Sequence, residues 1–470
     1  MLYNHLQSFD LILSYFKIFY FNLVPFALLT AFLAIFQYDL LLILITILTP
    51  LSVNLSQLIE GLPFDFSIFT EPFMAILLFV LICKFFLGKK LDRKILIHPV
   101  SIAIYINLFW IFITSVTSTM PIVSFKFFLV RTWFVVCFYF LAAEIFKNYN
   151  RAYKFFWYYA IPLTITIFYV FYNLHTNGTT DKIVVQNSMV PLFKDHTVYG
   201  AVVAMFVPGL IIFSFLKDSP FKRFRLLLIG LTIVFIIALI YSYSRAAWIS
   251  VVIAFIAIMI IKLKIKFRTL LILFTLFVFY FATYYNEIIM QLEKNKQDSS
   301  EELSKHVQSI TNIRTDASNL ERINRWSCAI RMFKEKPVFG WGPGTYMFQY
   351  APYQMSYNRT TSSSNFGEIG NAHSEYIGPL AEEGVLGSLT FIVIIVVTIL
   401  TALKIYQKTN DRFTKNLVLA MLSGLITYYT HGILNNFLDQ DKASVPFWGF
   451  MAVIVAIDIY HLEHKNTEAY

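Results

Sequence analysis

Long apolar stretches separated by short polar segments run through almost the whole chain. Twelve of these stretches approach the roughly 20 residues that an α-helix needs to cross a bilayer. They lie at residues 40–57, 67–87, 97–117, 122–145, 155–174, 197–216, 224–242, 246–262, 268–286, 376–403, 416–434 and 446–462. The pattern predicts an all-α polytopic membrane protein with about 12 transmembrane helices.

An earlier apolar stretch, residues 11–36, is a weaker candidate because Lys17, Asn22 and Pro25 interrupt it. If it crosses the membrane, the total is 13 and the N-terminus lies outside. If it lies at the inner interface, the total is 12 and both termini lie inside. The interruptions favour 12. Residues 1–10 contain no basic segment followed by a small-residue cleavage site, so we expect no removable signal peptide.

Basic residues are distributed unevenly between the two sets of short loops. One set carries twenty Lys and Arg residues, within 84–94, 147–154, 217–225, 262–268 and 404–415. The opposite set carries four, namely Lys182, Lys194, Arg245 and Lys442. Because cytoplasmic loops are enriched in Lys and Arg, the first set is predicted to be cytoplasmic. The net charge of +10 is then explained by the basic cytoplasmic loops rather than by nucleic-acid binding.

This orientation places the one long loop, residues 287–375, outside. In a bacterium with two membranes that side is the periplasm, so we expect a multi-pass protein of the inner membrane. The chain divides into N-terminal transmembrane helices (1–286), a large, partly helical periplasmic loop (287–375) and C-terminal transmembrane helices (376–470) of one integral membrane domain. The composition, 57% hydrophobic and 14% charged, agrees, since soluble domains are about a quarter charged.

The long loop changes character along its length. Residues 293–318 are polar, whereas Trp326 and Phe333 belong to an apolar set at helical spacing that stops at Pro337. This spacing predicts an amphipathic helix of about 15 residues that ends before the proline. A glycine-rich turn at 340–344 and an aromatic, then Ser/Thr-rich cover at 346–370 are expected to follow.

Three basic residues near the predicted outer face are candidates for binding an anionic group. Arg245 joins two apolar stretches with almost no loop, and its planar guanidinium suits phosphate. Lys126 and Arg131 lie on the span at 122–145, with Arg131 on the order of 15 Å along it. A cation at that depth is costly and is by default a functional candidate. The structural alternatives are a headgroup anchor at Arg245 and an ion pair of Arg131 with Asp195 or Glu71.

The predicted loop helix carries a second basic pair. Arg322 and Arg325 lie one turn apart, and Trp326 follows Arg322 at i+4. Such a face is suited to a diphosphate. The alternative is an ordinary solvated helix.

His373 lies where the long loop returns to the membrane. Imidazole titrates closest to neutral pH, which suits a general base; the alternative is a structural or helix-capping histidine. Glu383 follows within Glu382-Glu383-Gly384, a group that can form a bend at the start of an apolar helix.

Other polar groups carry weaker signals. Asp195 and His196 precede the span at 197–216, where Asp195 is expected to cap the helix or, alternatively, to hold substrate or orient a base. Asp439 and Asp441 form a DxD pattern that is too short to predict a metal site. The three cysteines show no CxxC spacing, and there is no Walker A, HExxH or Rossmann motif. A nucleotide-driven pump and a zinc protease are therefore unsupported.

Four segments together resemble the O-antigen ligase / O-antigen polymerase superfamily of bacterial membrane glycosyltransferases. They are Ser244-Arg245-Ala246-Ala247-Trp248, Arg322 with Trp326 leading into Pro337-Val338-Phe339-Gly340-Trp341-Gly342-Pro343-Gly344, His373 with Tyr376, and Glu383-Gly384-Val385-Leu386-Gly387. Their order, the late outer loop and the number of spans also match that family. The asparagine that usually follows the histidine is replaced by Ser374.

The resemblance implies transfer of a glycan from undecaprenyl diphosphate to an acceptor hydroxyl, with no nucleotide, metal or other cofactor. Carried over to this chain, Arg245 and Arg322 correspond to diphosphate-binding groups and His373 to the base, while Arg325 is an additional arginine. Further donor-binding candidates are Lys126 and Arg131, and supporting candidates are Asp195, His196, Trp326, Tyr376 and Glu383.

The possible functions differ in the molecule that accepts the glycan. An O-antigen ligase transfers to lipid A–core, a polymerase joins repeat units on the carrier, and a protein O-oligosaccharyltransferase modifies a polypeptide. A flippase or transporter for lipid-linked glycans belongs to a different class, and it would need polar groups through the full depth of the membrane. Here they gather on the outer side, which favours catalysis there. The expected partners are the lipid-linked glycan, lipid A–core or another glycan acceptor, and membrane lipids, with no nucleic acid.

Overall fold

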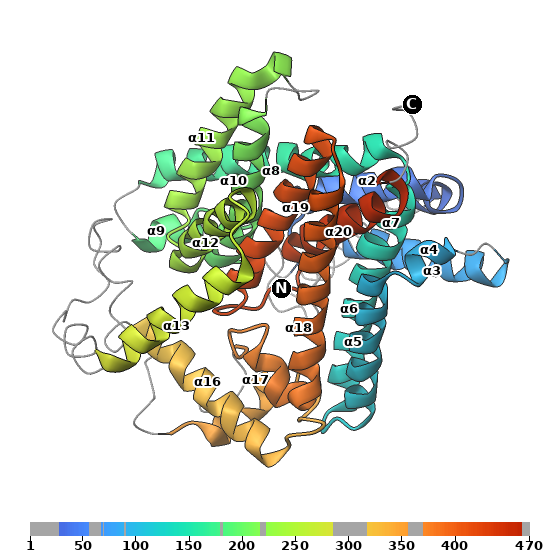
Figure 1. Ribbon diagram of the computed structural model, residues 1–470. Helices are drawn as coiled ribbons and strands as arrows, with labels where there is room; N and C mark the ends of the chain where they lie inside the picture. The colour runs from blue at the N-terminus through green and yellow to red at the C-terminus, as the bar shows by residue number, and fades with distance from the viewer. Residues whose placement is uncertain are drawn as a thin grey trace, which may run out of the picture.

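The computed structural model describes residues 28–55, 67–68, 70–88, 91–178, 182–216, 222–284, 317–355 and 370–462 (Figure 1). Each of the twelve predicted stretches coincides with a helix in this part of the chain. These helices are α2 (Tyr38–Leu48), α3 (Glu71–Phe86), α5 (Pro99–Val116), α6 (Pro121–Val135), α8 (Tyr149–Asn177), α10 (His196–Phe215), α11 (Arg225–Tyr241), α12 (Arg245–Lys262), α13 (Phe267–Thr283), α18 (Ile377–Lys408), α19 (Arg412–His431) and α20 (Asp441–Ala456). The described residues form no β-sheet, so the prediction of an all-α membrane protein is confirmed.

Seven helical runs in the described residues are long and apolar enough to cross a membrane. They are Pro99–Val116, Pro121–Ile145, Tyr149–Asn177, His196–Phe215, Arg245–Lys262, Ile377–Lys408 and Asp441–His461. Shorter apolar helices cover Tyr38–Leu51, Glu71–Cys83 and Arg225–Tyr241. The total of twelve crossings and the periplasmic side of the long loop stay predictions. So does the status of the segment at 11–36, of which residues 11–27 lie outside the described part.

Two helices form the centre of the bundle. In their most apolar windows 89% of α10 and 83% of α20 is buried, against 33% of α12 and 39% of α18. A helix that is apolar all round belongs in such a core, whereas α12 and α18 can turn an apolar face to lipid. The core is closely packed, because a side chain at Gly424 of α19 would come within 2.6 Å of the Met205 carbonyl oxygen.

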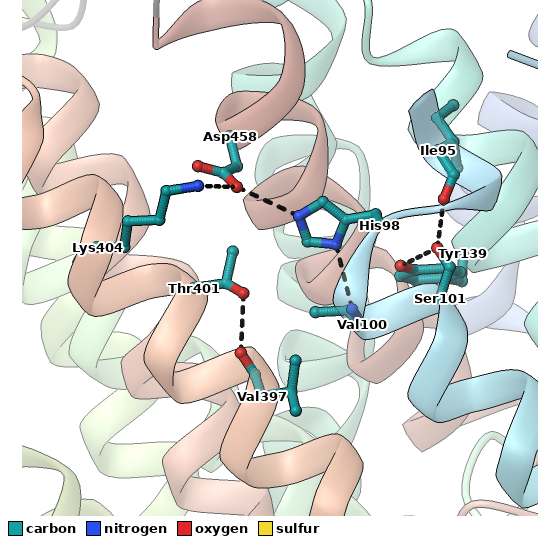
Figure 2. A network of polar contacts seen from close by, with 9 residues as sticks. All are labelled: Ile95, His98, Val100, Ser101, Tyr139, Val397, Thr401, Lys404 and Asp458. Atoms are coloured by element: carbon teal, nitrogen blue, oxygen red, sulfur yellow. Dashed lines mark hydrogen bonds and ion pairs between the residues drawn. The ribbon is translucent and has the colours of Figure 1, made fainter. Parts of the chain in front are cut away.

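Polar groups join three helices at the end of the bundle that carries the basic loops (Figure 2). His98, which caps α5, accepts the Val100 amide at Nδ1 (3.2 Å), so its proton lies on Nε2 and faces Asp458 at 3.3 Å. Lys404 of α18 donates to the same carboxylate oxygen at 2.8 Å. Asp458 lies in the π-helical continuation of α20, η8 (Ile457–His461), so one carboxylate connects α5, α18 and α20.

The described part of the long loop packs at the opposite end (Figure 1). α16 (Ala317–Glu335) and α17 (Tyr346–Gln349) lie beside the start of α18, next to the end of α5. α16 contains 19 residues and ends two residues before Pro337, so the expected amphipathic helix is confirmed and is somewhat longer than predicted. Most of the polar 293–318 segment, and residues 356–369 of the expected cover, lie outside the described residues.

Gly424→Ala is expected to destabilise the fold by about 1–3 kcal/mol, because the new methyl group would overlap the backbone of α10. Gly230→Ala on α11 is the matched control, since nothing lies within 4 Å of a Cβ there and alanine favours helix. Thermal unfolding of the purified protein in detergent measures both variants. Equal stability of the two would contradict the close packing of α10 against α19.

Candidate functional site

α18 is broken near its start, and the break organises the candidate site. Gly384 has φ 74° and ψ −169°, outside the helical range. The Pro337 carbonyl accepts the Val385 amide at 3.0 Å, so the loop after α16 crosses directly over the break. A Cβ at Gly384 would lie 2.0 Å from the Val338 carbonyl oxygen, which leaves room only for glycine. The bend expected at Glu382-Glu383-Gly384 is confirmed.

The glycine-rich turn satisfies the carbonyl groups that the break leaves without helical partners. Trp341 donates its amide to the Ala381 carbonyl at 3.0 Å, and Gly342 donates to the Glu382 carbonyl at 2.7 Å. Gly340 and Gly342 adopt φ 66° and 114°, which lets the backbone approach this closely. The Gly-Trp-Gly sequence therefore acts as a backbone clasp around the broken helix.

Side chains from the α5–α6 hairpin complete this clasp. The Trp110 indole donates to the Glu383 carbonyl at 2.8 Å and stacks on Phe339 with ring centroids 5.7 Å apart. Thr119 donates both its amide (3.0 Å) and its hydroxyl (2.8 Å) to the Trp341 carbonyl. α5, α6, α18 and the loop after α16 are thus held as one unit.

Glu375 connects the start of α18 to the turn between α19 and α20. Its carboxylate is buried and accepts the Tyr428 hydroxyl (2.7 Å) and the amides of Phe437 (2.9 Å) and Leu438 (3.0 Å). Its own amide donates to the Gly432 carbonyl at 2.8 Å. Burial raises the pKa of Glu375, and the nearby Arg131 acts against that rise.

Arg131 faces a group of carboxylates. It lines a cavity of about 50 Å³ together with Glu375, Glu382, Glu383 and Asp439, and its guanidinium lies 5.3 Å from a phenylalanine ring. Arg131 acts electrostatically on each of these four acids. This differs from the expectation of Asp195 or Glu71 as partners, because the broken start of α18 brings acids to Arg131 from another part of the chain. Glu383 is buried in this cluster.

His373 lies on the segment at 370–376 that leads into α18. It has φ 49°, and its amide donates to the Asn371 side chain at 3.0 Å. Its pKa is lowered to about 4, first by burial and then by the positive charges of Arg325 and Arg322. The imidazole is therefore neutral at neutral pH and able to accept a proton.

Arg325 and Arg322 have different surroundings. Arg325 is buried, pairs with Glu321 at 2.6 Å, lies 5.2 Å over the Tyr350 ring and donates to the Asn371 carbonyl at 3.1 Å. It therefore holds the segment that presents His373. Arg322 is less buried, and its Nε donates to the Leu434 carbonyl at 3.2 Å.

Neighbouring groups fix the start of α18. The Ser374 hydroxyl accepts the amides of Tyr376 and Ile377, each at 3.2 Å, so this position caps the helix. The Tyr376 hydroxyl donates to the Tyr429 carbonyl at 2.7 Å. The indole nitrogen of Trp326 is buried and has no hydrogen-bond partner within the described part of the chain.

The remaining candidates lie at the same end of the bundle. Asp195 caps α10 by accepting the amides of Thr197 (2.7 Å) and Val198 (3.0 Å), as its position predicted. His196 contacts the Ser242 carbonyl at 2.8 Å, and this contact ties the start of α10 to the turn before α12. Asp195 also acts electrostatically on His373.

Arg245 is the first residue of α12, directly after that turn, and is partly buried. Lys126 is exposed on α6. Of the DxD pair, Asp441 accepts the hydroxyls of Ser52 (2.8 Å) and Thr70 (2.6 Å) and so anchors α20 to the N-terminal part of the bundle.

Arg322, Arg325 and Asp195 therefore all act electrostatically on His373. Arg131 and Glu383 line an adjoining acidic cavity, to which Ser374 and Asn436 also contribute. Glu375, His431 and Asn435 were not among the candidate residues that the sequence pattern predicted. Nothing in the local pattern distinguishes them, because their surroundings come from segments far apart in the chain.

Comparison with protein families identifies one match. The family described as O-Antigen ligase covers residues 230–392 of this chain. This match over residues 230–392 supports the resemblance to the O-antigen ligase / O-antigen polymerase superfamily. The matched region contains Arg245, Arg322, Arg325, His373 and the break at Gly384. No curated protein matches the chain.

Gly384→Ala is expected to lower stability by more than the roughly 1–2 kcal/mol that a left-handed conformation costs alanine. The extra loss arises because the methyl group would push the Val338 carbonyl away and open the clasp. Gly88→Ala is the control, with a similar φ of 82° and no atom within 4 Å of the added Cβ. Thermal unfolding compares them, and a Gly384 variant no less stable than the Gly88 variant would disprove the clasp.

Proposed function

We propose that this protein is a glycosyltransferase that moves a glycan from undecaprenyl diphosphate to an acceptor hydroxyl at the periplasmic face of the inner membrane. An O-antigen ligase with lipid A–core as the acceptor is the first reading. The observation that carries the proposal is a neutral, partly buried imidazole, His373, beside the cationic face of α16, in the region that matches the O-antigen ligase family.

In the proposed reaction the acceptor oxygen attacks the anomeric carbon of the carrier-linked sugar. His373 takes the proton of that hydroxyl, and the bond between the sugar and the diphosphate breaks. Undecaprenyl diphosphate leaves with the bonding electron pair. Arginines at the diphosphate stabilise the negative charge that develops on it. No nucleotide and no metal is required, so activity is expected to persist in EDTA.

Arg322 and Arg325 of α16 suit different roles. Arg322 is less buried than Arg325 and is oriented by the Leu434 carbonyl, so we assign it to the donor diphosphate together with Arg245. Arg325 is buried against Glu321 and Tyr350, so we assign it to positioning His373 and to adding positive charge. Lys126 and Arg131 stay candidates for donor binding, although Arg131 already faces carboxylates.

Donor binding is expected to strengthen the base. Arg325 and Arg322 both lower the pKa of His373, and a bound diphosphate would neutralise much of their effect. The pKa of His373 would then rise above about 4, while burial, the larger cause of its lowering, would still hold it below the ordinary value. The imidazole therefore becomes a better proton acceptor when the donor is in place.

His373→Asn is expected to reduce kcat by about 10²–10⁴-fold, the range lost with a general base. Asparagine tolerates the left-handed conformation of this residue, which separates loss of the base from loss of the fold. Glycan transfer is measured with purified protein, carrier-linked glycan and lipid A–core. Full activity of the variant would disprove the base assignment.

The same assay distinguishes the acceptors. Transfer to lipid A–core indicates a ligase, and lengthening of the carrier-linked glycan without such transfer indicates a polymerase of the same family. Transfer to neither substrate, with a polypeptide acceptor modified instead, indicates a protein O-oligosaccharyltransferase.

The pH profile provides a further test. Because only neutral His373 accepts a proton, activity falls as the pH drops through its pKa. In kcat/KM for the donor, which reports the free enzyme, this fall is expected near pH 4, and in kcat it is expected at higher pH. Arg322→Gln should move the fall in kcat/KM upward, because one pKa-lowering charge is removed. A fall near 6.5 in kcat/KM for both proteins would contradict the predicted environment of His373.

A further inference from the structure

The turn between α19 and α20 holds an unusual set of buried polar atoms. Both ring nitrogens of His431, the amide nitrogen of Asn435 and the amide oxygen of Asn436 are buried and have no hydrogen-bond partner among the described residues. His431 is 1% exposed and Asn435 is 3% exposed. Buried polar side-chain atoms are normally paired, so a group of four such atoms within six residues needs an explanation.

A loosely held turn does not explain these atoms. The His431 carbonyl accepts the amides of Leu434 (3.0 Å) and Asn435 (3.1 Å), and the His431 ring packs 5.7 Å from the Phe437 ring. The buried Glu375 carboxylate accepts the amides of Phe437 and Leu438 just beyond. The backbone of the turn is therefore satisfied and fixed, while its side-chain polar atoms are not. A rigid frame with unpaired polar atoms is the arrangement of a preorganised binding site.

The turn adjoins the proposed donor site. Arg322 donates its Nε to the Leu434 carbonyl at 3.2 Å, within the turn. Arg322 and Asp195 act electrostatically on His431, and both also act on His373. A ligand that contacts the unpaired atoms of the turn is therefore next to the group that we assign to the diphosphate.

The types of unpaired atom indicate the class of ligand. A neutral imidazole offers one donor and one acceptor, Asn435 offers donors, and Asn436 offers an acceptor. A phosphate group at neutral pH only accepts hydrogen bonds, so it would leave the acceptors of this turn unsatisfied. Each hydroxyl group of a sugar both donates and accepts. The mixed set therefore matches a sugar ring better than a diphosphate.

We propose that His431, Asn435 and Asn436 form a sugar-binding subsite that holds the hydroxyl groups of the first sugar of the donor, the one bonded to the diphosphate. This subsite rests on the proposed function, because Arg322 places the turn beside the diphosphate. It makes the α19–α20 turn a determinant of which carrier-linked glycans are accepted. His431 acts here as a positioning residue, distinct from the proposed base His373.

The test compares a donor that has the sugar with a probe that lacks it. The variants His431→Phe, Asn435→Leu and Asn436→Leu remove the polar atoms and keep similar bulk. Ile433→Ala is the matched control, since this residue of the same turn is 48% exposed. For each purified protein, KM is measured for the carrier-linked glycan, and the inhibition constant is measured for undecaprenyl diphosphate without sugar.

Each variant is expected to raise the KM of the sugar-bearing donor by roughly tenfold, which is the loss of about one buried hydrogen bond. The inhibition constant of undecaprenyl diphosphate should stay unchanged, whereas Arg322→Ala should weaken both. Equal weakening of both ligands, or no change in either, would overturn the sugar subsite.

A fallback variant and the wild-type protein keep the test decisive. If thermal unfolding shows that His431→Phe is not folded, Asn436→Leu, at a less buried position, supplies the same comparison. If the wild-type protein does not transfer the glycan, the proposed function itself is wrong. Normal wild-type transfer with unaffected variants disproves the subsite alone.

Discussion

The break in α18 at Gly384 is the constraint on which the candidate site depends. A continuous helix would satisfy its own carbonyls and would leave no partners for the loop that follows α16. Because the helix is broken, the carbonyls of Ala381, Glu382 and Glu383 accept donors from the Gly-Trp-Gly turn and from Trp110. Non-helical backbone at the membrane is tolerated only where protein or water satisfies its polar groups, and here the protein supplies all three donors. The clasp therefore sets the position of α16, and with it the position of its arginines.

A second constraint is the cost of burying charge. Glu375 is satisfied by a hydroxyl and two amides, and Arg325 by Glu321, a carbonyl and an aromatic face. Buried charges persist only with such partners. Through these partners Glu375 and Arg325 hold the segment that carries His373. The unpaired atoms of the α19–α20 turn contrast with them, and that contrast separates the framework of the site from the surface that meets substrate.

Sequence reasoning identified the helices, the α16 amphipathic helix and the capping role of Asp195, because each depends on local periodicity or on neighbouring residues. The family resemblance assigned His373 and Arg322 to one site, with Arg325 as an additional arginine. It could not separate the roles of these two arginines. Their difference arises from Glu321 and Tyr350 on one side and from Leu434 on the other, and the last contact joins residues 112 positions apart. For the same reason the predicted partners of Arg131 were incorrect.

The sequence by itself determined that this is an all-α membrane protein with a region similar to the O-antigen ligase family, because hydropathy is summed along the chain and the motifs are contiguous. Only the tertiary structure decided what surrounds each polar group. Whether a buried carboxylate, guanidinium or imidazole is satisfied depends on donors and acceptors contributed by other helices. Glu375 and His431 each lie near one end of a predicted apolar stretch. The fold surrounds one with hydrogen-bond donors and leaves the other without a partner in the described chain.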